Sequence, residues 1–437
     1  MDNWKLEYEK KLTNPEEAVK CVHDGDVVYV GTCTSTAYAL CDALGERGEE
    51  LNDVRISCSH LRYPTRIMTG RDRDTFKITT FFMGAQERVA RADGAYVDYT
   101  NLHLSQVDVF CRDIIPARVA FLEVSRPDEN GYMSFGATGV ALDTYVREKA
   151  EVIVLEVNAY APYVFGSDNL IHVSEADMIV EADRLISEAK DLPATEDIRQ
   201  ISEYIVDQIP DGACIQLGIG GVANAVGFGL KNKTDLSAHT ELMTNSVMDL
   251  MKQGVITNKK KGYIPGKTTA SFSLGTKELY DFLDHNEDMY FQPFPVINDP
   301  LNIAQNDNMI SVNSALSVDV FGQVCADNIA GRQFSATGGQ LDFVKGAQMS
   351  KGGKSFIALP SVGVNRKGER FSKINARLPF GAAVTTPRSE VQYVVTEYGC
   401  VNLKLLTMRQ RVEAMIGLAH PDFRDQIREE VREAGIF

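Results

Sequence analysis

The feature that most constrains the fold of this chain is a pattern that occurs twice along it. An amphipathic helical segment is followed by an Asp-Gly pair and an apolar run that closes on glycine, first over Asp24–Gly31 and again over Asp211–Gly218. Asp-Gly pairs favour turns, and a short apolar run after a turn favours a strand. Each copy therefore predicts a helix, a turn, a strand and a glycine-ended loop in that order.

Two further matches follow the first in both halves. Ala137–Asp143 matches Ala336–Asp342, and Glu151–Asn158 matches Val391–Gly399, in which each apolar strand is closed by a carboxylate. Three matches in the same order indicate a duplicated α/β unit rather than chance similarity.

The apolar strands predict the type of sheet. Runs such as Ser355–Leu359 and Tyr393–Val395 lack polar alternation, which is typical of parallel strands covered by helices on both faces. At 437 residues the chain exceeds the size at which one hydrophobic core keeps growing. We therefore predict two similar doubly wound, Rossmann-like α/β domains, residues 1–190 and residues 191–437, which separate within the polar segment Glu188–Glu196.

Composition argues against several classes of function. The net charge of −15 opposes general nucleic-acid binding, and no run approaches the ~18 uncharged apolar residues of a membrane span. The charged N-terminal segment does not resemble a signal peptide, so we expect a cytoplasmic protein with no membrane partner. The cysteines form no Cys-x-x-Cys pair and have no histidine at ligand spacing, which predicts free thiols and no metal site: Cys21, Cys33, Cys41, Cys58, Cys111, Cys214, Cys325 and Cys400.

The loop after the second copy's strand is nearly free of side-chain bulk. It consists of Gly218, Ile219, Gly220, Gly221 and Val222. Such a loop before a helix can place backbone N–H groups against an anion or a developing oxyanion, although packing alone can also require glycine in a tight turn.

A dinucleotide site is a competing interpretation of the same loop. Gly218-x-Gly220-x-x-Ala223 fits the fingerprint, and Glu241, 23 residues beyond Gly218, could bind the ribose of a nicotinamide cofactor. Two features count against it. Glu241 lies at a strand-to-helix junction, and Asn313 with Gly338-Gly339 supplies further donors that a dehydrogenase would not need.

With these residues in view, the chain resembles the acetyl-CoA hydrolase/transferase family of CoA-transferases, most closely its butyryl-CoA:acetate and 4-hydroxybutyrate CoA-transferase branch. The likeness runs nearly from end to end. It is carried by five ordered blocks: Gln216–Val226, His239–Leu250, Gly338–Ser361, Tyr393–Gly399 and Ala419–Arg424.

The resemblance implies roles for particular residues. The family's catalytic glutamate corresponds to Glu241, and its active site lies where the two halves meet. The backbone amides of residues 218–222 and of Gly338 and Gly339 are implied to bind the oxyanion or thioester, and Asn313 to position the reacting carbonyl. No cofactor is implied beyond the coenzyme A thioesters that serve as substrates, and a homo-oligomer is expected for paired α/β domains of this size.

The implied reaction moves CoA between a short-chain acyl-CoA and acetate. Glu241 would form an acyl-glutamyl anhydride and then a glutamyl-CoA thioester, with ping-pong kinetics. An acyl-CoA hydrolase on the same site is an alternative within the family. A nucleophilic glutamate must be ionised, so we expect the neighbouring amides to keep Glu241 anionic at neutral pH.

The CoA phosphates need local cations in an acidic protein. Lys345, Lys351 and Lys354 are candidates, with Arg332 as a weaker one, although scattered lysines on a solvated loop would look the same. We expect packing roles for His239 and for Glu397, whose counterpart in the first copy is Glu156.

Overall fold

Each of two units in the computed structural model carries its own mainly parallel β-sheet. The structure describes residues 3–191, 193–329 and 331–436. The first unit comprises Met1–Lys190 and Thr269–Ile297, and the second comprises Asp191–Thr268 and Asn298–Phe437. The predicted α/β class with two domains is confirmed.

One segment departs from the predicted domain limits. The break at 190/191 matches, but Thr269–Ile297 packs with the first unit rather than with the rest of 191–437. The Phe291 N–H donates to the Phe165 carbonyl at 2.8 Å, and the Tyr280 hydroxyl donates to the Ser187 carbonyl at 2.8 Å. Hydrogen bonds between residues so far apart in the chain leave no mark in local sequence, which is why the excursion was missed.

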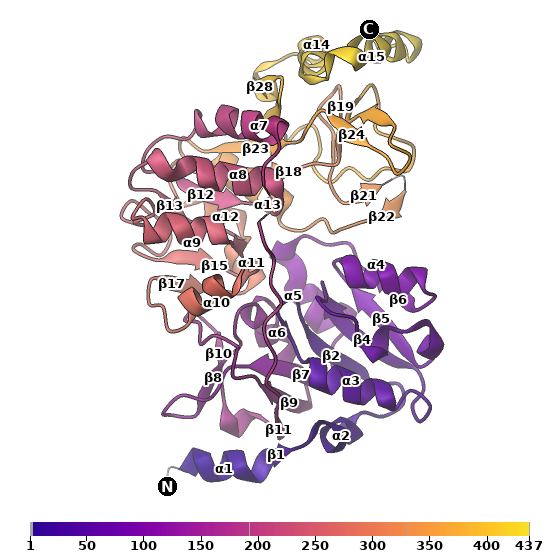
Figure 1. Ribbon diagram of the computed structural model, residues 1–437, viewed down its shortest axis with the longest axis vertical. Coiled ribbons are helices and arrows are strands. Elements are labelled where there is room, and N and C mark those ends of the chain that lie inside the picture. Colours follow the sequence, from indigo (N-terminus) through magenta and orange to yellow (C-terminus); the bar gives the residue numbers. More distant parts are fainter. Residues whose placement is uncertain (1–2, 192, 330, 437) are drawn as a thin grey trace. The chain divides into compact units, whose positions relative to one another are not determined.

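The sheet of the first unit consists of parallel strands in the order β1-β11-β9-β7-β2-β4-β5-β6. Figure 1 shows β2, β4, β5 and β6 side by side. The strand bounds are β1 Leu12–Thr13, β2 Val27–Thr32, β4 Val54–Ser59, β5 Phe76–Thr80, β6 Tyr96–Tyr99, β7 Val119–Val124, β9 Val152–Val157 and β11 Met178–Glu181, with β3 Ser35–Thr36 antiparallel to β2. The helices are α1 Asn3–Lys11, α2 Pro15–Ala18, α3 Tyr38–Glu46, α4 Ala85–Ala92, α5 Val107–Val109, α6 Asp143–Arg147, α10 Lys277–Leu283 and α11 Phe294–Ile297.

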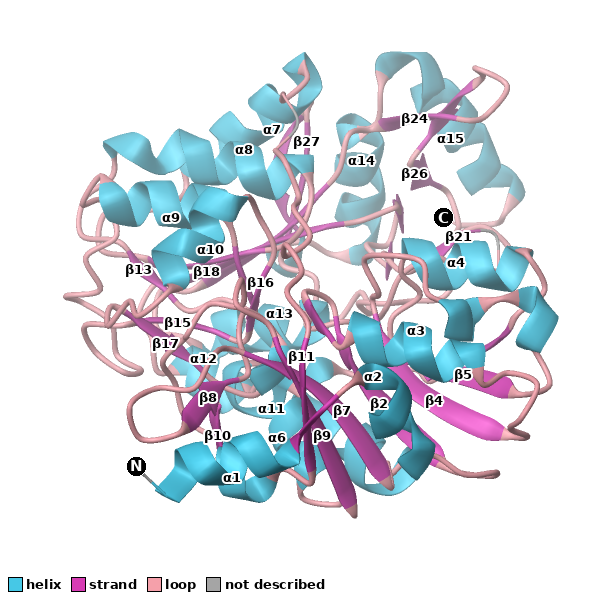
Figure 2. Cartoon of the chain, turned by 60° about the horizontal axis from the view of Figure 1, so that its bottom comes forward, coloured by secondary structure: helices cyan, strands magenta, loops and turns pink. Residues whose placement is uncertain are grey.

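The sheet of the second unit has the order β13-β12-β18-β23-β27-β28, and only its edge strand β28 runs antiparallel. Helices α7, α8 and α9 lie together over its strands (Figure 1 and Figure 2). The strand bounds are β12 Cys214–Leu217, β13 Ser237–Ala238, β18 Met309–Ser314, β23 Lys354–Ala358, β27 Tyr393–Thr396 and β28 Gly399–Asn402. The helices are α7 Glu196–Val206, α8 Gly221–Gly229, α9 Asn245–Lys252, α12 Pro300–Ala304, α13 Gln340–Met349, α14 Met408–Leu418 and α15 Pro421–Glu433.

Further short strands pair outside the two main sheets. In the first unit β8 Tyr132–Ser134 pairs with β10 Leu170–His172. In the second, β19 Ser317–Asp319 lies between β20 Val324–Cys325 and β26 Ile374–Asn375. Two hairpins follow, β21 Asn328–Ile329 with β22 Arg332–Gln333 and β24 Val362–Val364 with β25 Arg370–Ser372.

The duplication is visible in the strand order. The run β4-β2-β7-β9-β11 of the first unit corresponds to β13-β12-β18-β23-β27 of the second. The match of β2 with β12 fits this correspondence, and so does that of Ala137–Asp143 with Ala336–Asp342. The third match was wrong by one strand, because β9 corresponds to β23 and not to β27. Buried apolar strands have similar compositions, so a comparison of sequences alone can match a strand with the neighbour of its true counterpart.

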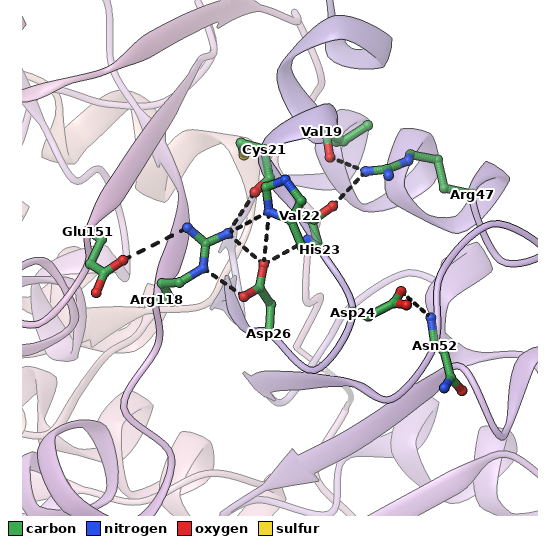
Figure 3. Close-up of polar contacts among 10 residues, drawn as sticks. All are labelled: Val19, Cys21, Val22, His23, Asp24, Asp26, Arg47, Asn52, Arg118 and Glu151. Atoms are coloured by element: carbon green, nitrogen blue, oxygen red, sulfur yellow. Dashed lines mark hydrogen bonds and ion pairs between the residues drawn. The ribbon is translucent and has the colours of Figure 1, made fainter.

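The Asp-Gly turns form at equivalent places. Gly25 and Gly212 both adopt φ +76°, a left-handed conformation that favours glycine. Arg118, just before β7, donates from Nε and Nη2 to the Asp26 carboxylate at 2.6 and 2.5 Å, and Figure 3 shows the same guanidinium reaching Glu151. Arg118 thereby joins the amino ends of β2, β7 and β9, which leaves the carboxyl ends available for ligands.

The described part of the chain was compared with two kinds of feature, membrane-spanning helices and metal-binding clusters. None of its helices combines the length and apolar composition that crossing a bilayer requires. Its described residues contain no cluster of three metal-binding side chains, and its cysteines are free thiols.

Two buried carboxyl groups lie side by side in the first unit. Glu123 on β7 and Glu156 on β9 are register neighbours, and they are 2% and 0% exposed. Burial raises the pKa of Glu123 well above its ordinary value, and the neighbouring Glu156 raises it further. Burial also raises the pKa of Glu156 to about 7, although the N–H groups of Leu40 and Ala39 at the start of α3 donate to its carboxylate. Burial therefore favours the protonated form of Glu123 in the folded chain.

Glu123→Gln should remove a pH-dependent cost to stability. The folded chain binds the Glu123 proton more tightly than the unfolded chain does, because glutamates of an unfolded chain titrate near ~4.3. The stability that this proton contributes is therefore fully present below about pH 4.3 and is lost as the pH rises toward the folded-state pKa of Glu123. We expect the variant to gain stability over the parent as pH increases, by at most about 1.4 kcal/mol per pH unit. Urea unfolding at pH 5.5, 7 and 8.5 measures this.

The exposed Glu129→Gln is the matched control, and it should follow the parent at every pH. If the difference between Glu123→Gln and the parent does not change with pH, the buried proton is absent.

Candidate active site

Three neighbouring strands of the second unit deliver the predicted site residues to one edge of its sheet. β13, β12 and β18 are parallel, with Ala238 opposite Ile215 and Val312 opposite Leu217. Glu241 follows the end of β13, the glycine loop follows β12, and Asn313 is the last residue but one of β18. Adjacent strands are roughly 4.8 Å apart, so these residues share one carboxyl edge, where ligands bind in open α/β sheets.

The Glu241 carboxylate is held by two amides. Asn298 donates from Nδ2 to Oε2 at 2.8 Å, and the backbone N–H of Gly339, directly before α13, donates as well. The positive end of the α13 dipole therefore faces the carboxylate. A Cβ at position 339 would lie 2.0 Å from Glu241 Oε2 and 2.0 Å from Asn298 Nδ2, so glycine is required here for space.

Burial nevertheless dominates the titration of Glu241. Burial raises the pKa of Glu241 to about 7. The hydrogen bond from Asn298 lowers the pKa, the charge of the nearby Asp342 carboxylate raises it, and the hydrogen bond from the Gly339 N–H lowers it. The expectation that amides would keep Glu241 fully ionised at neutral pH was therefore wrong. Loss of water from a half-buried carboxylate outweighs two hydrogen bonds, and the group is about half ionised at neutral pH.

The glycine loop supplies fewer donors than its sequence indicated. The Gly218 N–H donates to the Val312 carbonyl at 2.9 Å, so it cannot also serve an oxyanion. In the described chain no acceptor lies against the N–H groups of Ile219, Gly220, Gly221 and Val222. Gly220 adopts φ +107° as the N-cap of α8, and no side chain caps this helix start.

Asn313 lies beside this loop. Its amide and that of Gln216 donate to each other at 3.3 and 3.4 Å, and a Cβ at Gly218 would come within 3.3 Å of Asn313 Oδ1. The pair fixes the orientation of the Asn313 amide. Gly338, with φ +62°, shapes the turn that places the Gly339 N–H against Glu241.

The predicted lysines do not gather at this edge. Helix α13 begins at the carboxyl edge and runs back, so Lys351, just before β23, and Lys354, its first residue, lie at the amino edge. Lys351 lies 3.7 Å from the Asp307 carboxylate, and Lys354 donates to the Gln208 carbonyl at 2.9 Å. Lys345 is exposed on α13, and Arg332 is exposed on the β21–β22 hairpin. Their binding of CoA phosphates stays a prediction, and the geometry does not favour it for Lys351 and Lys354.

The packing roles of His239 and Glu397 stay predictions, and Glu156 is not the counterpart of Glu397, because β9 corresponds to β23. His239 is fully buried and its ring lies 5.2 Å from that of Tyr263. Glu397 is 7% exposed and accepts hydrogen bonds from the Ser361 N–H and hydroxyl.

Sequence reasoning missed Asn298 and Asp342. Asn298 directly precedes Asp299-Pro300, which starts α12, and nothing in that helix-start signal indicates contact with Glu241. Asp342 could have been found, because it closes the second repeated match. Its counterpart Asp143 is also buried and accepts a hydrogen bond from the Tyr29 hydroxyl at 2.7 Å.

Comparison with known proteins matches both halves of the chain. Residues 1–188 match the acetyl-CoA hydrolase/transferase N-terminal domain, and residues 275–431 match the corresponding C-terminal domain.

Full-length relatives and solved structures are also similar. The chain is 38% identical to the butyryl-CoA:acetate CoA-transferase of Anaerostipes caccae, over 100% of this chain and 99% of the relative. It is 38% identical to the 4-hydroxybutyrate coenzyme A transferase of Clostridium kluyveri, over 98% and 99%. The crystal structure of RipA from Yersinia pestis superposes with a TM-score of 0.93 at 35% identity and covers 100% of both chains.

Gly339→Ala should destabilise the protein by about 1–3 kcal/mol, the usual cost of forcing a methyl group into filled space. Its Cβ would overlap Glu241 Oε2 and Asn298 Nδ2, each 2.0 Å away. Urea unfolding measures the loss. Part of it should disappear in a Glu241→Gly background, because one of the two clashing groups is then absent.

Gly417→Ala on the exposed face of α14 is the control. Nothing lies within 4 Å of its Cβ position, so this change should be neutral or stabilising by up to about 1 kcal/mol. Equal effects at the two glycines would contradict the close approach of Gly339 to Glu241.

Proposed function

Because the chain belongs to the acetyl-CoA hydrolase/transferase family and is a CoA-transferase, we propose that it moves CoA between a short-chain acyl-CoA, such as butyryl-CoA or 4-hydroxybutyryl-CoA, and acetate. One observation carries the proposal. The Glu241 carboxylate is held by the Asn298 amide and the Gly339 N–H, at the edge where four N–H groups of the glycine loop have no acceptor among the described residues.

The first half of the reaction uses Glu241 as a nucleophile. Its carboxylate oxygen attacks the thioester carbonyl carbon, the C–S bond breaks, and the electron pair leaves on the CoA thiolate. The thiolate then attacks the Glu241 carbonyl carbon of the resulting acyl-glutamyl anhydride. The C–O bond breaks, the acyl carboxylate departs, and Glu241 is left as a glutamyl-CoA thioester.

The acceptor acid completes the cycle by the reverse steps. Its carboxylate attacks the glutamyl thioester, and the thiolate released from it attacks the acyl carbon of the new anhydride, which restores the Glu241 carboxylate. No step needs a metal, an oxidant or a net proton. The kinetics are therefore ping-pong.

The chain's own groups stabilise the charge that develops in these steps. The N–H groups of Ile219, Gly220, Gly221 and Val222 are placed to receive a tetrahedral oxyanion, and losing one such donor costs roughly 3–4 kcal/mol in comparable sites. Asn298 and Gly339 orient the attacking carboxylate, and the Asn313 amide lies beside the loop to position the carbonyl.

Lys373 is a better placed candidate for a CoA phosphate than the three lysines above. It is half-buried, and its backbone N–H donates at 2.8 Å to the carbonyl of Ser361, which follows the carboxyl end of β23. Burial lowers the pKa of Lys373, and the nearby Glu397 opposes that shift. An arriving phosphate would supply a further counter-charge.

Of the two alternative functions, hydrolysis remains open and the nicotinamide-dependent reaction does not. Hydrolysis uses the same site with water as the acceptor. A transferase incorporates labelled acetate into acyl-CoA, whereas a hydrolase releases free CoA thiol, so measuring both products separates the two activities. The nicotinamide interpretation has lost its basis, because the chain is a CoA-transferase and the acid it required, Glu241, is bonded to Asn298 and Gly339.

Glu241→Gln should lower turnover at least about 10³-fold, because an amide cannot form the anhydride. In the parent protein, incubation with butyryl-CoA and no acceptor, followed by borohydride reduction and peptide mass spectrometry, should find the modification on Glu241 alone. The exposed Glu203→Gln on α7 should react like the parent. Modification of another residue would mean that Glu241 is not the nucleophile.

The rate of acylation should depend on pH through Glu241. Only the anion attacks, and its pKa is raised to about 7, so the rate should rise about tenfold per pH unit below pH 7 and level off above it. Asp342→Asn removes a negative neighbour, which favours the anion and should move the inflection to lower pH. Single-turnover acylation between pH 5 and 9 measures both; a profile flat across pH 6–8 would contradict the raised pKa.

A further inference from the structure

The first residue of α13 links two segments that carry donors of the candidate active site. Gln340 donates from Nε2 to the carbonyl of Ser314 at 2.9 Å, and its Oε1 accepts the Thr386 hydroxyl at 2.8 Å. Ser314 ends β18 and directly follows Asn313, while Gln340 directly follows Gly339. One side-chain amide therefore joins the start of α13 to the strand that carries Asn313.

We propose that Gln340 is a positioning residue for the Glu241 carboxylate, because its side chain holds the Gly339 N–H in place against that carboxylate. The inference rests on the proposed CoA transfer through Glu241. Every residue that it involves belongs to the second unit. Gln340 acts through Gly339 and is not itself a catalytic residue.

The start of α13 lacks the side chain that usually fixes the beginning of a helix. Its N-cap is Gly339, which has no side chain to accept the free N–H groups of the first turn. A larger residue does not fit there, since its Cβ would lie 2.0 Å from Glu241 Oε2. Gly338 precedes it with φ +62°, and glycines lose more conformational freedom on folding than other residues do. A neighbouring side chain is therefore the means of keeping the Gly339 N–H in one place.

The two partners of Gln340 are themselves fixed. Ser314 is paired with Ala358 in the parallel sheet. Thr386 is fully buried, and its backbone N–H donates to the Val324 carbonyl at 3.3 Å. A strand end and a buried hydroxyl thus give the first residue of α13 two firm points of attachment.

The rest of α13 is held by other contacts. A Cβ at Gly346 would lie 2.5 Å from the Cβ of Ile303 on α12, so the two helices approach closely. Gln348, near the end of α13, donates to the Glu390 carbonyl at 2.6 Å. Losing the hydrogen bonds of Gln340 should therefore loosen the first turn of α13 without unfolding the helix.

Glutamine suits this position chemically. Its amide donates and accepts at once, whereas an ionised glutamate only accepts and a lysine only donates. Both functions of the Gln340 amide are in use. A residue without an acceptor would leave the buried Thr386 hydroxyl unpaired, which is unfavourable away from water.

The effect on Glu241 has a definite sign. The Gly339 N–H lowers the pKa of Glu241 against the effect of burial, so displacing this N–H should raise the pKa and leave less anion at neutral pH. Asp342, the charged group that raises the pKa of Glu241, lies on the same helix. A hydrogen bond weakens steeply when its angle changes, whereas the interaction of two charges falls only with their separation. The loss of the N–H bond should therefore dominate.

Single-turnover acylation by butyryl-CoA between pH 5 and 9 tests the proposal in Gln340→Met, which keeps the length of the side chain without its hydrogen bonds. We expect the inflection to rise by about 1 pH unit, the size of a lost hydrogen bond to a charged group, and the rate at pH 7 to fall about 5-fold. Thr386→Val removes only the hydroxyl and should move the inflection in the same direction by less. Thr386→Ser keeps the hydroxyl and should behave like the parent.

Gln348→Met is the matched control, because it removes the same kind of hydrogen bond from the other end of α13. Urea unfolding should show that both methionine variants lose stability, but only Gln340→Met should change the pH profile. An unmoved inflection in both Gln340→Met and Thr386→Val, or an equal shift in Gln348→Met, would overturn the inference.

A measurement without turnover separates this inference from the proposed function. In protein isotope-labelled at the glutamate carboxyl carbons, the NMR signal that is missing from Glu241→Gln identifies Glu241 and reports its titration. A higher pKa in Gln340→Met than in the parent supports the positioning role, and an equal pKa contradicts it. If the parent forms no adduct at Glu241 with butyryl-CoA, the proposed function fails, while the NMR comparison still decides the role of Gln340.

Discussion

Parallel pairing of β13, β12 and β18 is the constraint on which the candidate active site depends. Because these strands run in the same direction and in register, Glu241, the glycine loop and Asn313 emerge at one edge although about a hundred residues separate the first from the last. Helices α8 and α13 also begin at that edge, since each follows a loop at a strand's carboxyl end. The N–H groups at these helix starts make the edge favourable for negative charge.

The electrostatics of Glu241 are a balance between loss of water and hydrogen bonding. Two amides stabilise its anion, while burial and Asp342 favour its neutral form, and the result is a pKa of about 7. A carboxylate poised near neutral pH is more basic than an exposed one, and its anion is accordingly the stronger nucleophile. Glu123 of the first unit lies beside the buried Glu156, and there burial and the neighbouring carboxyl both favour its protonated form.

The two units share one strand order but carry different side chains at equivalent positions. Asp143 and Asp342 close equivalent segments and both are buried, but Tyr29 donates to Asp143 whereas Asp342 lies near Glu241. At the third residue after the equivalent strands the two units carry opposite charges, Arg62 and Glu241. The order of five strands is shared because it follows from packing helices on a parallel sheet. The loop residues are free to differ because they bear little of that packing.

The amino-acid sequence by itself determined the two α/β units, their parallel strands, the Asp-Gly turns and the place of Glu241 between a strand and a helix. These follow from periodicity and turn chemistry, which act over a few residues. Only the tertiary structure decided that Asn298 and Gly339 hold Glu241, that Val312 takes the Gly218 N–H, that Lys351 and Lys354 lie at the far edge, and that residues 269–297 join the first unit. Each of these depends on where a distant part of the chain returns and on how much water it excludes, and neither quantity is encoded in a local pattern.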